Sequence, residues 1–468
     1  LSLKSNNLVQ LHPQLFSRLT RLRLLYLNDN KLQGLPGDIF RALIQVSTID
    51  LKNNQLTTLP GEKVPATLPS TTVALSFSNC SINSLKPEDL AQFANALTIF
   101  VVKDSALKDV RPGSLAASTN LSALMITGTE VQDLPEDLFQ SLKMLQSLNL
   151  MSNRLLVLRP GWFSQLSDLK LLDLSKNFFT TVPVETFRSL TTLNKLLLSG
   201  NNISHLPEEA FKGLSKLKIL RLNRNALQEL SAAGVFKDLE NLQTIVLKNN
   251  KLRNLEKGLF QGLKNVKEIQ LHGNEIDQIE EGTFDELENL ERLHLAKNNI
   301  SSVSTDLFSK LAKLQTLRLY ENQLTSVPED IFHNLTNLKE VALSGNKLTE
   351  LSPKLFPHKD KLVKLYLENN LLTTLPPQFF VDFPQLKTLT LQKNNLRTLP
   401  PVLFETLPKL SSLSLSENNL STLPKGLFSP LEKMKTLDLS KNHFVTMSAE
   451  YFEGLGGLRE LKLENNKI

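Results

Sequence analysis

Residues 145–155 read LQSLNLMSNRL, and this eleven-residue pattern recurs along the chain. Its fixed positions spell LxxLxLxxNxL and are Leu145, Leu148, Leu150, Asn153 and Leu155. The same pattern returns at residues 22–32 and 410–420, and its asparagine position can be followed through twenty units. Sixteen of the nineteen intervals between these positions are 24 residues long. Such a constant period indicates a tandem-repeat architecture.

The composition agrees with a repeat and excludes several protein classes. Leucine makes up more than a fifth of the 468 residues. Charged residues form 21% of the chain, and no apolar run approaches the length of a membrane span. The net charge of +6 permits an acidic partner without requiring nucleic acid. A single cysteine excludes a disulfide framework within these residues.

The LxL segment of each unit predicts a short strand, because its residues alternate between inward and outward with period two. One unit cannot bury its own leucines, so neighbouring coils must bury one another and their strands stack in parallel. The pattern is identified as the leucine-rich repeat. We expect a mostly β solenoid of the α/β repeat class, with about twenty units and one long concave parallel sheet.

Two further positions recur in register with the leucines. Asparagine follows the strand in 17 units, where the turn has buried backbone groups and an amide offers donors and an acceptor. We therefore expect an asparagine ladder that bonds the backbone of adjacent coils. Ten residues later, sixteen units carry phenylalanine, including Phe163, Phe308 and Phe452, with Phe236 displaced by a one-residue insertion. These rings should stack as a spine on the convex side.

Both markers fail between residues 54 and 129. The ladder positions there hold Cys80, Ser105 and Thr129, and the spine positions hold Val64, Leu90 and Leu115. We predict three segments: N-terminal repeats at 1–60, irregular repeats and a candidate junction at 61–129, and a regular array at 130–468. Residues 59–77 resemble the proline-rich lead-in of extracellular leucine-rich domains, which would make 1–60 an additional short array. The alternative is a local insertion within one continuous solenoid.

The ends of the chain fall inside repeats, since Leu1 and Leu3 already read as strand leucines and the chain stops at Ile468. Exposed terminal coils require caps, so we expect capping segments beyond both ends. Cys80 stands at a ladder position and is expected to be a buried, small side chain rather than a reactive thiol.

Units of 24 residues with an asparagine ladder, a phenylalanine spine and no long helix resemble the extracellular type of leucine-rich repeat. From about Val64 onward, the layout resembles the group that includes the carboxypeptidase N regulatory subunit, the acid-labile subunit and snake serum phospholipase inhibitors. This resemblance implies a glycosylated, non-catalytic protein that holds and protects an enzyme partner. Residues 1–60 depart from that layout. The alternative is the ectodomain of a Toll-like or related receptor that recognises a microbial or host ligand.

Sequons for N-glycosylation support a secreted or cell-surface location weakly. They begin at Asn79, Asn120, Asn202, Asn299, Asn334 and Asn419. Three of them, at Asn202, Asn299 and Asn419, directly follow ladder asparagines and should point outward.

No pattern in the sequence predicts catalysis. The seven histidines are scattered and accompany no nucleophile, metal or phosphate-loop signature. We therefore predict a protein that is not an enzyme, with no cofactor and no bound metal. His272 and His294 lie on adjacent predicted strands, where a lone metal site or a pH-sensing pair is conceivable. We predict solvated surface histidines instead.

Binding is the function that the repeat favours, because its outward strand positions are free of repeat constraints. Arginine and tyrosine, which are favoured at interfaces, gather among these positions between residues 218 and 366. The predicted contact residues are Arg221, Arg224, His272, Arg292, His294, Arg318, Tyr320 and Tyr366. Interspersed Glu268, Glu291 and Glu321 weaken a purely electrostatic interaction. We expect a protein partner on the concave face rather than nucleic acid, and the alternative is an ordinary solvated face. Val101, Met125 and Leu197 form a second, apolar outward patch.

Overall fold

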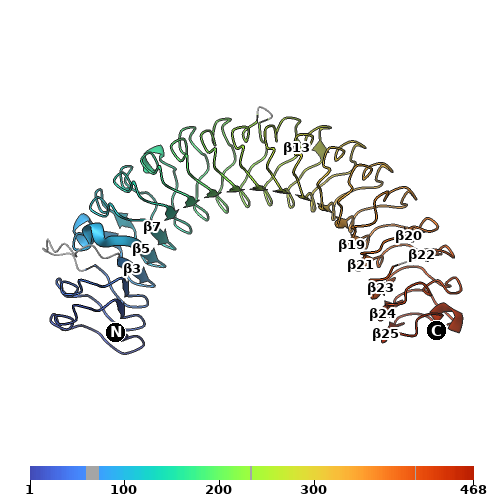
Figure 1. Ribbon diagram of the computed structural model, residues 1–468, viewed down its shortest axis with the longest axis horizontal. Coiled ribbons are helices and arrows are strands. Elements are labelled where there is room, and N and C mark those ends of the chain that lie inside the picture. Colours follow the sequence, from blue (N-terminus) through green and yellow to red (C-terminus); the bar gives the residue numbers. More distant parts are fainter. Residues whose placement is uncertain (60–72, 232–233, 406) are drawn as a thin grey trace. The chain divides into compact units, whose positions relative to one another are not determined.

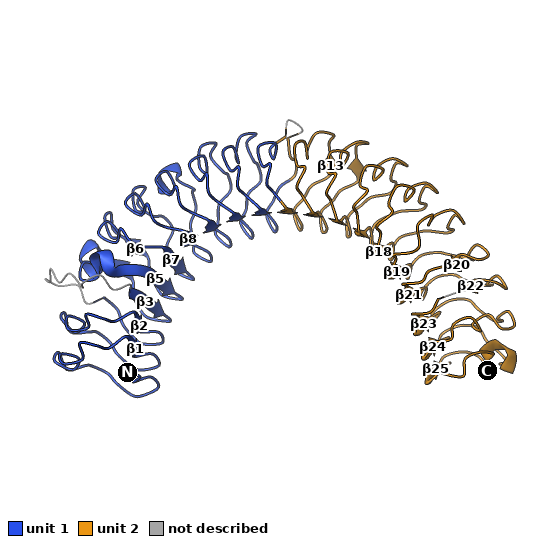
Figure 2. Cartoon of the chain, in the orientation of Figure 1, with its two compact units in different colours: residues 1–227, 235–242 blue, residues 228–234, 243–468 orange. Residues whose placement is uncertain are grey.

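The computed structural model describes residues 1–59, 73–231, 234–405 and 407–468. It divides into two compact units of coils (Figures 1 and 2). Unit 1 comprises Leu1–Leu227 and Val235–Leu242, and unit 2 comprises Gln228–Gly234 and Gln243–Ile468. The three segments predicted from repeat type, 1–60, 61–129 and 130–468, remain a prediction. The proposed lead-in at 59–77 and the spine position Val64 fall largely or wholly outside the described residues.

Each unit contains one parallel sheet that takes one strand from each successive coil, as the repeat predicted. In unit 1 the strands are β1 Leu24–Tyr26, β2 Thr48–Asp50, β3 Val73–Ser78, β5 Leu97–Lys103, β7 Ala123–Thr127, β8 Ser147–Asn149, β9 Leu171–Asp173, β10 Lys195–Leu197 and β11 Ile219–Arg221. In unit 2 they are β12 Thr244–Val246, β14 Glu268–Gln270, β16 Arg292–His294, β17 Thr316–Arg318, β18 Glu340–Ala342, β19 Lys364–Tyr366, β21 Thr388–Thr390, β23 Ser412–Ser414, β24 Thr436–Asp438 and β25 Glu460–Lys462. Within each unit the strands lie on the inner side of the curve (Figure 2).

The remaining elements are short. Paired strands away from the main sheets are β4 Ser84–Leu85 with β6 Asp109–Val110, β13 Asn254–Leu255 with β15 Gln278–Ile279, and β20 Phe380–Val381 with β22 Phe404–Glu405. Single turns of 3-10 helix occur at Pro87–Asp89, Ala94–Ala96, Pro160–Trp162 and Ala449–Phe452. The described residues include no helix with the length and apolar character needed to cross a membrane.

The predicted asparagine ladder is present and joins neighbouring coils. The Asn298 side chain is 5% exposed, and its amide nitrogen donates to the carbonyls of Leu271 at 3.1 Å and Leu295 at 3.0 Å. Its amide oxygen accepts from the Ile276 N–H at 3.0 Å. One side chain therefore satisfies backbone groups in its own coil and in the preceding coil. The same three-way pattern recurs at Asn54, Asn177, Asn346 and Asn418.

A left-handed residue precedes the ladder position in all twenty units, from Ser5 to Asn465. Lys297, for example, has a φ of 54°, and its N–H donates to the carbonyl of Tyr320 in the next coil at 2.8 Å. This conformation turns the chain sharply at the end of the strand and aims the following asparagine inward. The sequence pattern gave no sign of it, because residues as large as lysine and glutamate occupy the position beside four glycines.

The phenylalanine spine is also present in both units. In unit 2, the centroids of Phe260 and Phe284 lie 5.9 Å apart, and those of Phe284 and Phe308 lie 6.1 Å apart. Phe236 is fully buried despite the insertion that displaces it. Phe452, in the last coil, is half-buried.

The irregular coils of unit 1 compensate for their missing ladder asparagines with longer strands. β3, β5 and β7 contain 6, 7 and 5 residues, whereas the regular strands contain 3. Cys80 is buried as predicted, and its Sγ lies 3.5 Å from the carbonyl oxygen of Leu51 in the preceding coil. Burial raises the pKa of this thiol, which agrees with a structural role. More backbone pairing between strands thus replaces the missing side-chain bonds.

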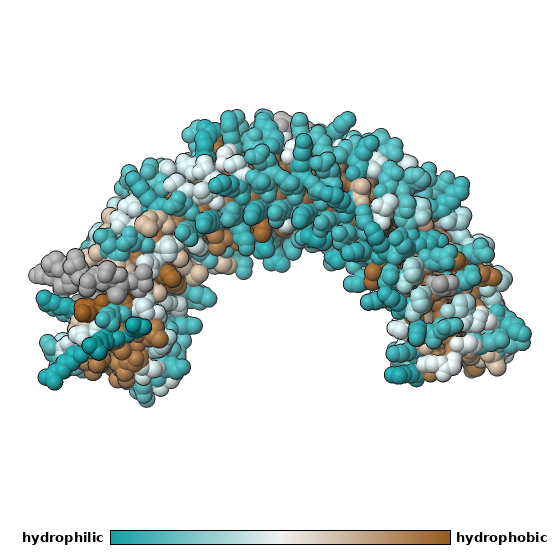
Figure 3. All heavy atoms as spheres, in the orientation of Figure 1, coloured by the Kyte–Doolittle hydropathy of each residue, from teal (hydrophilic) through white to brown (hydrophobic). Residues whose placement is uncertain are grey.

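The first two coils of unit 1 expose apolar side chains. Leu1, Leu15 and Leu24 have exposed fractions of 44%, 45% and 44%. Figure 3 shows apolar surface at this end of unit 1.

We predict that replacing Asn298 with leucine lowers the free energy of unfolding by about 2 to 5 kcal/mol. The substitution leaves the Ile276 N–H buried without its acceptor. It also removes one of the two side-chain donors to the Leu271 carbonyl, which then keeps only Asn274. Urea unfolding followed by circular dichroism measures the change. Asn299→Ala is the matched control, because Asn299 is the exposed neighbour and should tolerate truncation. Equal stability of the two variants would contradict the role assigned to the ladder.

Candidate functional site

The outward positions of unit 2 form columns that run across the sheet. In a strand such as β17, Leu317 is buried while Thr316 and Arg318 on either side reach the surface. Parallel register aligns equivalent positions of β14, β16, β17, β18 and β19. One column contains Gln270, His294, Arg318, Ala342 and Tyr366, and the other contains Glu268, Arg292, Thr316, Glu340 and Lys364. We refer to the outward side of these five strands and the turn residues that follow them as the strand face of unit 2.

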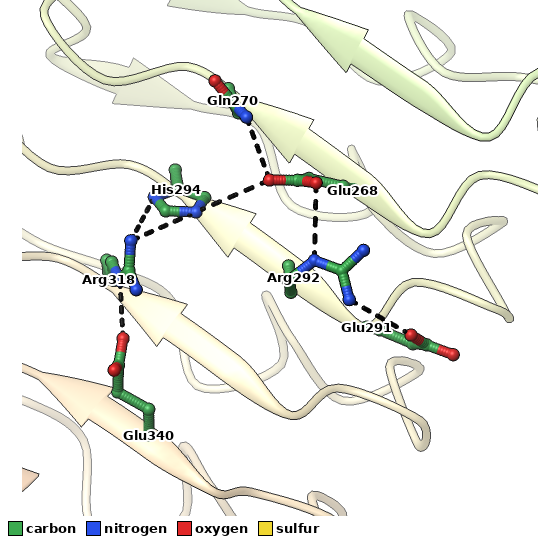
Figure 4. Close-up of polar contacts among 7 residues, drawn as sticks. All are labelled: Glu268, Gln270, Glu291, Arg292, His294, Arg318 and Glu340. Carbon is green, nitrogen blue, oxygen red and sulfur yellow. Dashed lines mark hydrogen bonds and ion pairs between the residues drawn. The ribbon is translucent and has the colours of Figure 1, made fainter. Parts of the chain in front are cut away.

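Two of the predicted contact residues are held in ion pairs on this face (Figure 4). Arg292 Nε lies 3.4 Å from Glu268 Oε2, and its Nη1 lies 3.3 Å from Glu291 Oε2. Arg318 Nε donates to Glu340 Oε2 at 2.5 Å. These carboxylates largely neutralise the two guanidinium groups, so the strand face of unit 2 is not a basic patch.

The two histidines meet as predicted, but His294 is not a solvated surface residue. Its side chain is buried with 8% exposure, and its ring centroid lies 5.3 Å from that of the half-buried His272. Arg318 Nη1 lies 3.4 Å from His294 Nδ1 and 3.5 Å from Nε2, while Glu268 Oε1 lies 3.8 Å from Nε2 (Figure 4). The prediction of solvent exposure is wrong here because large side chains from the flanking strands cover the ring.

Both imidazoles are neutral near pH 7. Burial, together with the guanidinium of Arg318, lowers the pKa of His294 to about 4, against the weaker opposing effect of Glu268. Burial also lowers the pKa of His272, with the charges of Lys248 and Arg318 acting in the same direction. Among the described residues, no group of three or more histidine, cysteine or carboxylate side chains is arranged to hold a metal ion.

A hollow of about 360 Å³ lies beside this network, over β17, β18 and β19. Its lining residues are Arg318, Tyr320, Glu321, Glu340, Ala342, Ser344, Tyr366 and Glu368. The middle coil contributes the small residues Ala342 and Ser344, and its two neighbours contribute the tyrosines. The structure thus brings three predicted residues, Arg318, Tyr320 and Tyr366, to one depression in the strand face of unit 2.

The other predicted contact residues belong to unit 1. Arg221 is the last residue of β11 and is exposed. Arg224 is also exposed, but it occupies the left-handed position before a ladder asparagine, with a φ of 55°. It is therefore a turn residue rather than a strand residue. The apolar patch of Val101, Met125 and Leu197 lies on β5, β7 and β10 of the same unit, with each side chain half-buried.

Sequence reasoning missed Glu340 and the two small residues that form the hollow. Glu340 is 8% exposed and has Lys364 Nζ 3.8 Å from its second oxygen, in addition to Arg318. Its partners lie 22 and 24 residues away in sequence, which is one coil in either direction. Writing consecutive strands above one another would have revealed these pairs, whereas a search for favoured interface residues could not.

Comparison with family models gives a match over most of the chain. The model described as leucine rich repeat matches residues 21–63, 95–155, 144–203, 191–234, 232–276, 264–324, 312–372, 360–420 and 408–468. Comparison with curated protein sequences gave no match.

Three of the solved structures similar to this chain come from an insect, a bacterium and a plant. Drosophila Toll, solved in complex with Spatzle, is 24% identical over 85% of this chain, with a TM-score of 0.75. The chain spans about half the length of that Toll chain, 54%. A leucine-rich repeat protein of Leptospira interrogans is 25% identical over 96% of both chains, with a TM-score of 0.68. A plant peptide hormone receptor in complex with RGF2 is 24% identical over 100% of this chain and 86% of its own, with a TM-score of 0.64.

We predict that His294 makes the stability of unit 2 depend on pH. Its pKa is about 4 in the folded protein and returns towards 6.5 on unfolding, so the unfolded chain binds the proton more readily between these values. The free energy of unfolding should therefore fall as the pH drops from about 6.5 to about 4. Between about pH 7 and about pH 5, we expect this residue to account for a loss of about 2 kcal/mol.

His294→Gln provides the comparison, because its amide does not titrate and can still accept a hydrogen bond from Arg318. Urea unfolding at both pH values should show a smaller loss for this variant than for the unaltered protein. The same loss in both proteins would exclude His294 as the source.

Proposed function

The chain belongs to the leucine-rich repeat family, and from this we propose that it is a non-catalytic extracellular scaffold that holds a protein partner on the strand face of unit 2. The observation that carries the proposal is the concentration of arginine, tyrosine and carboxylate side chains on β14 to β19, around a hollow. These side chains occupy outward positions that the buried core does not use. Arginine and tyrosine in such a setting are favoured anchors of protein interfaces.

A protein suits this surface better than a polyanion does. Arg292 and Arg318 are already paired with Glu268 and Glu340, so their charge is not available to phosphate or sulfate groups. A partner with both acidic and basic side chains could instead form ion pairs with the arginine and glutamate residues of this network. Complementary charge patterns of this kind confer specificity more than affinity.

We propose that the chain is secreted or displayed at the cell surface. The support is the resemblance of its 24-residue units to extracellular repeats, together with the exposure of four of the six sequon asparagines, Asn79, Asn202, Asn299 and Asn334. At this location two roles compete. In the first, the chain is a regulatory or stabilising subunit of a secreted enzyme, as its resemblance to the carboxypeptidase N regulatory subunit suggests.

The second role is that of a receptor ectodomain. The likeness to Toll and to a plant peptide hormone receptor, over 85% and 100% of this chain, favours it. Those structures are complexes with Spatzle and with RGF2, respectively. In this role the same strand face would recognise a microbial or host ligand.

Affinity capture from the native extracellular fluid, followed by mass spectrometry and activity assays, separates the two roles. Recovery of a hydrolase in stoichiometric amount, especially a metallocarboxypeptidase, supports the subunit role. Binding to cells or microbial material without an enzyme supports the receptor role. If variants of the strand face bound the captured partner as tightly as the unaltered chain does, the proposed binding surface would be wrong.

We predict that Tyr320→Ala combined with Tyr366→Ala weakens partner binding at least about tenfold. Both rings line the hollow, and truncating buried aromatic anchors typically costs more than 1 kcal/mol each. Surface plasmon resonance with the captured partner measures the loss. Lys310→Ala is the control, because Lys310 is exposed and lies just after the spine residue Phe308, away from the strands. A loss of similar size for the control would indicate that the partner binds elsewhere.

We also predict glycans at Asn202 and Asn299 when the chain is made in a eukaryotic secretory host. Both side chains are exposed, whereas the Asn120 amide donates to the carbonyl of Asn95 at 2.7 Å and should be modified less. Peptide mass spectrometry before and after removal of N-glycans measures occupancy at each sequon. Absence of glycan at all six sequons would argue against an extracellular location.

A further inference from the structure

We propose that the hollow over β17, β18 and β19 is a subsite for one lysine or arginine side chain of the partner. This inference rests on the proposed function, because it names the chemistry that the strand face of unit 2 recognises. The hollow arises from a specific order of side-chain sizes along the sheet. It is bounded by three coils, all of which lie within unit 2.

The shape of the hollow suits a single extended side chain. Ala342 is 3% exposed and lies with Ser344 in the middle coil, where neither rises far above the backbone. Tyr320 lies in the preceding coil and Tyr366 in the following one. Adjacent strands are about 4.8 Å apart, so these two coils are separated by about 10 Å. In the strand register, Tyr366 shares a column with Arg318 and Ala342, whereas Tyr320 lines up with Ser344. The two rings therefore flank the hollow diagonally, and the small residues of the middle coil leave space for one aliphatic chain.

The charges of the hollow favour a cation. Three carboxylates, of Glu321, Glu340 and Glu368, line it together with a single guanidinium, that of Arg318. The Arg318 guanidinium donates to one oxygen of Glu340, and the Lys364 ammonium lies near the other oxygen. The positive charge of Arg318 is therefore committed to Glu340 and does not balance the remaining two carboxylates.

Glu321 and Glu368 retain their capacity for an incoming cation. Glu321 is exposed and has Lys297 Nζ at 4.0 Å, a distance at which an exposed ion pair contributes little. Glu368 accepts a hydrogen bond from the hydroxyl of Thr390, a neutral partner that positions the carboxylate without cancelling its charge. Both can therefore form charge-assisted hydrogen bonds with an ammonium or guanidinium group.

The tyrosines distinguish a basic side chain from a metal ion or an anion. Lysine and arginine have an apolar stem that packs against aromatic rings and a charged end that stays near polar groups. A cation also interacts favourably with the face of a tyrosine ring. An anion would meet the carboxylates of Glu321 and Glu368 in the lining of the hollow. The carboxylates are not arranged in a metal-binding group among the described residues.

Selection from a phage-displayed library of random peptides on the intact chain tests this subsite. We expect the selected peptides to be enriched in lysine or arginine, and replacement of that residue by norleucine to weaken binding at least about tenfold. Ser344→Gln should weaken the same peptides to a similar extent, because the longer side chain fills the floor of the hollow. Glu368→Gln should weaken them too, since it removes charge with little change of shape.

Ser440→Gln is the matched control. Ser440 occupies the same repeat position as Ser344, four coils further along unit 2, and is similarly half-buried. Peptides that bind Ser344→Gln and Ser440→Gln equally well, or that carry no basic residue, would overturn the subsite. If such peptides still lose affinity with the Tyr320→Ala and Tyr366→Ala double variant, the strand face remains the binding surface and only the assigned chemistry fails. If neither Ser344→Gln nor the double tyrosine variant weakens the binding of any selected peptide, both the subsite and the strand face as the binding surface are wrong.

Discussion

The buried hydrogen bonds of the ladder asparagines are the constraint on which the rest of the structure depends. Each strand ends in a turn whose backbone groups cannot reach water, and the amide of a residue such as Asn298 satisfies groups in two coils at once. This bond fixes the distance and register between neighbours. Register in turn places equivalent outward residues in columns, so the strand face of unit 2 exists because the ladder repeats. Where the ladder lacks asparagine, at Cys80 and Thr129, the strands of unit 1 lengthen and take over the connection.

Most of the fold could be predicted from the sequence, because the period of 24 residues places the same residue types at the same position in every coil. Strand positions, the ladder and the spine follow from which residues recur. The left-handed residue before each ladder position could not be found this way, since Lys297 and Glu321 share that conformation with glycines.

The candidate site was predicted less completely, for a physical reason. Residue type indicated Arg318, Tyr320 and Tyr366, and the structure places these three together. Their surroundings depend on side chains one coil away, such as Glu340, and on how small Ala342 is. A net charge of +6 permits an acidic partner, whereas the hollow in this face is lined by three carboxylates and a single guanidinium. Local compensation of charge, rather than the total, determines what such a surface can bind.

The left-handed positions also limit how freely coils could be exchanged. Gly128 and Asp104 occupy the same left-handed position in successive coils. A Cβ atom at Gly128 would collide with the Asp104 side chain. In unit 2, a Cβ atom at Gly273 would likewise collide with the side chain of Asn249. Deleting or transplanting a whole coil would preserve the period and the core leucines, yet it would set a different side chain against each large neighbour. Shortened or chimeric arrays built from this chain should therefore keep the coil of Gly128 with that of Asp104, and the coil of Gly273 with that of Asn249.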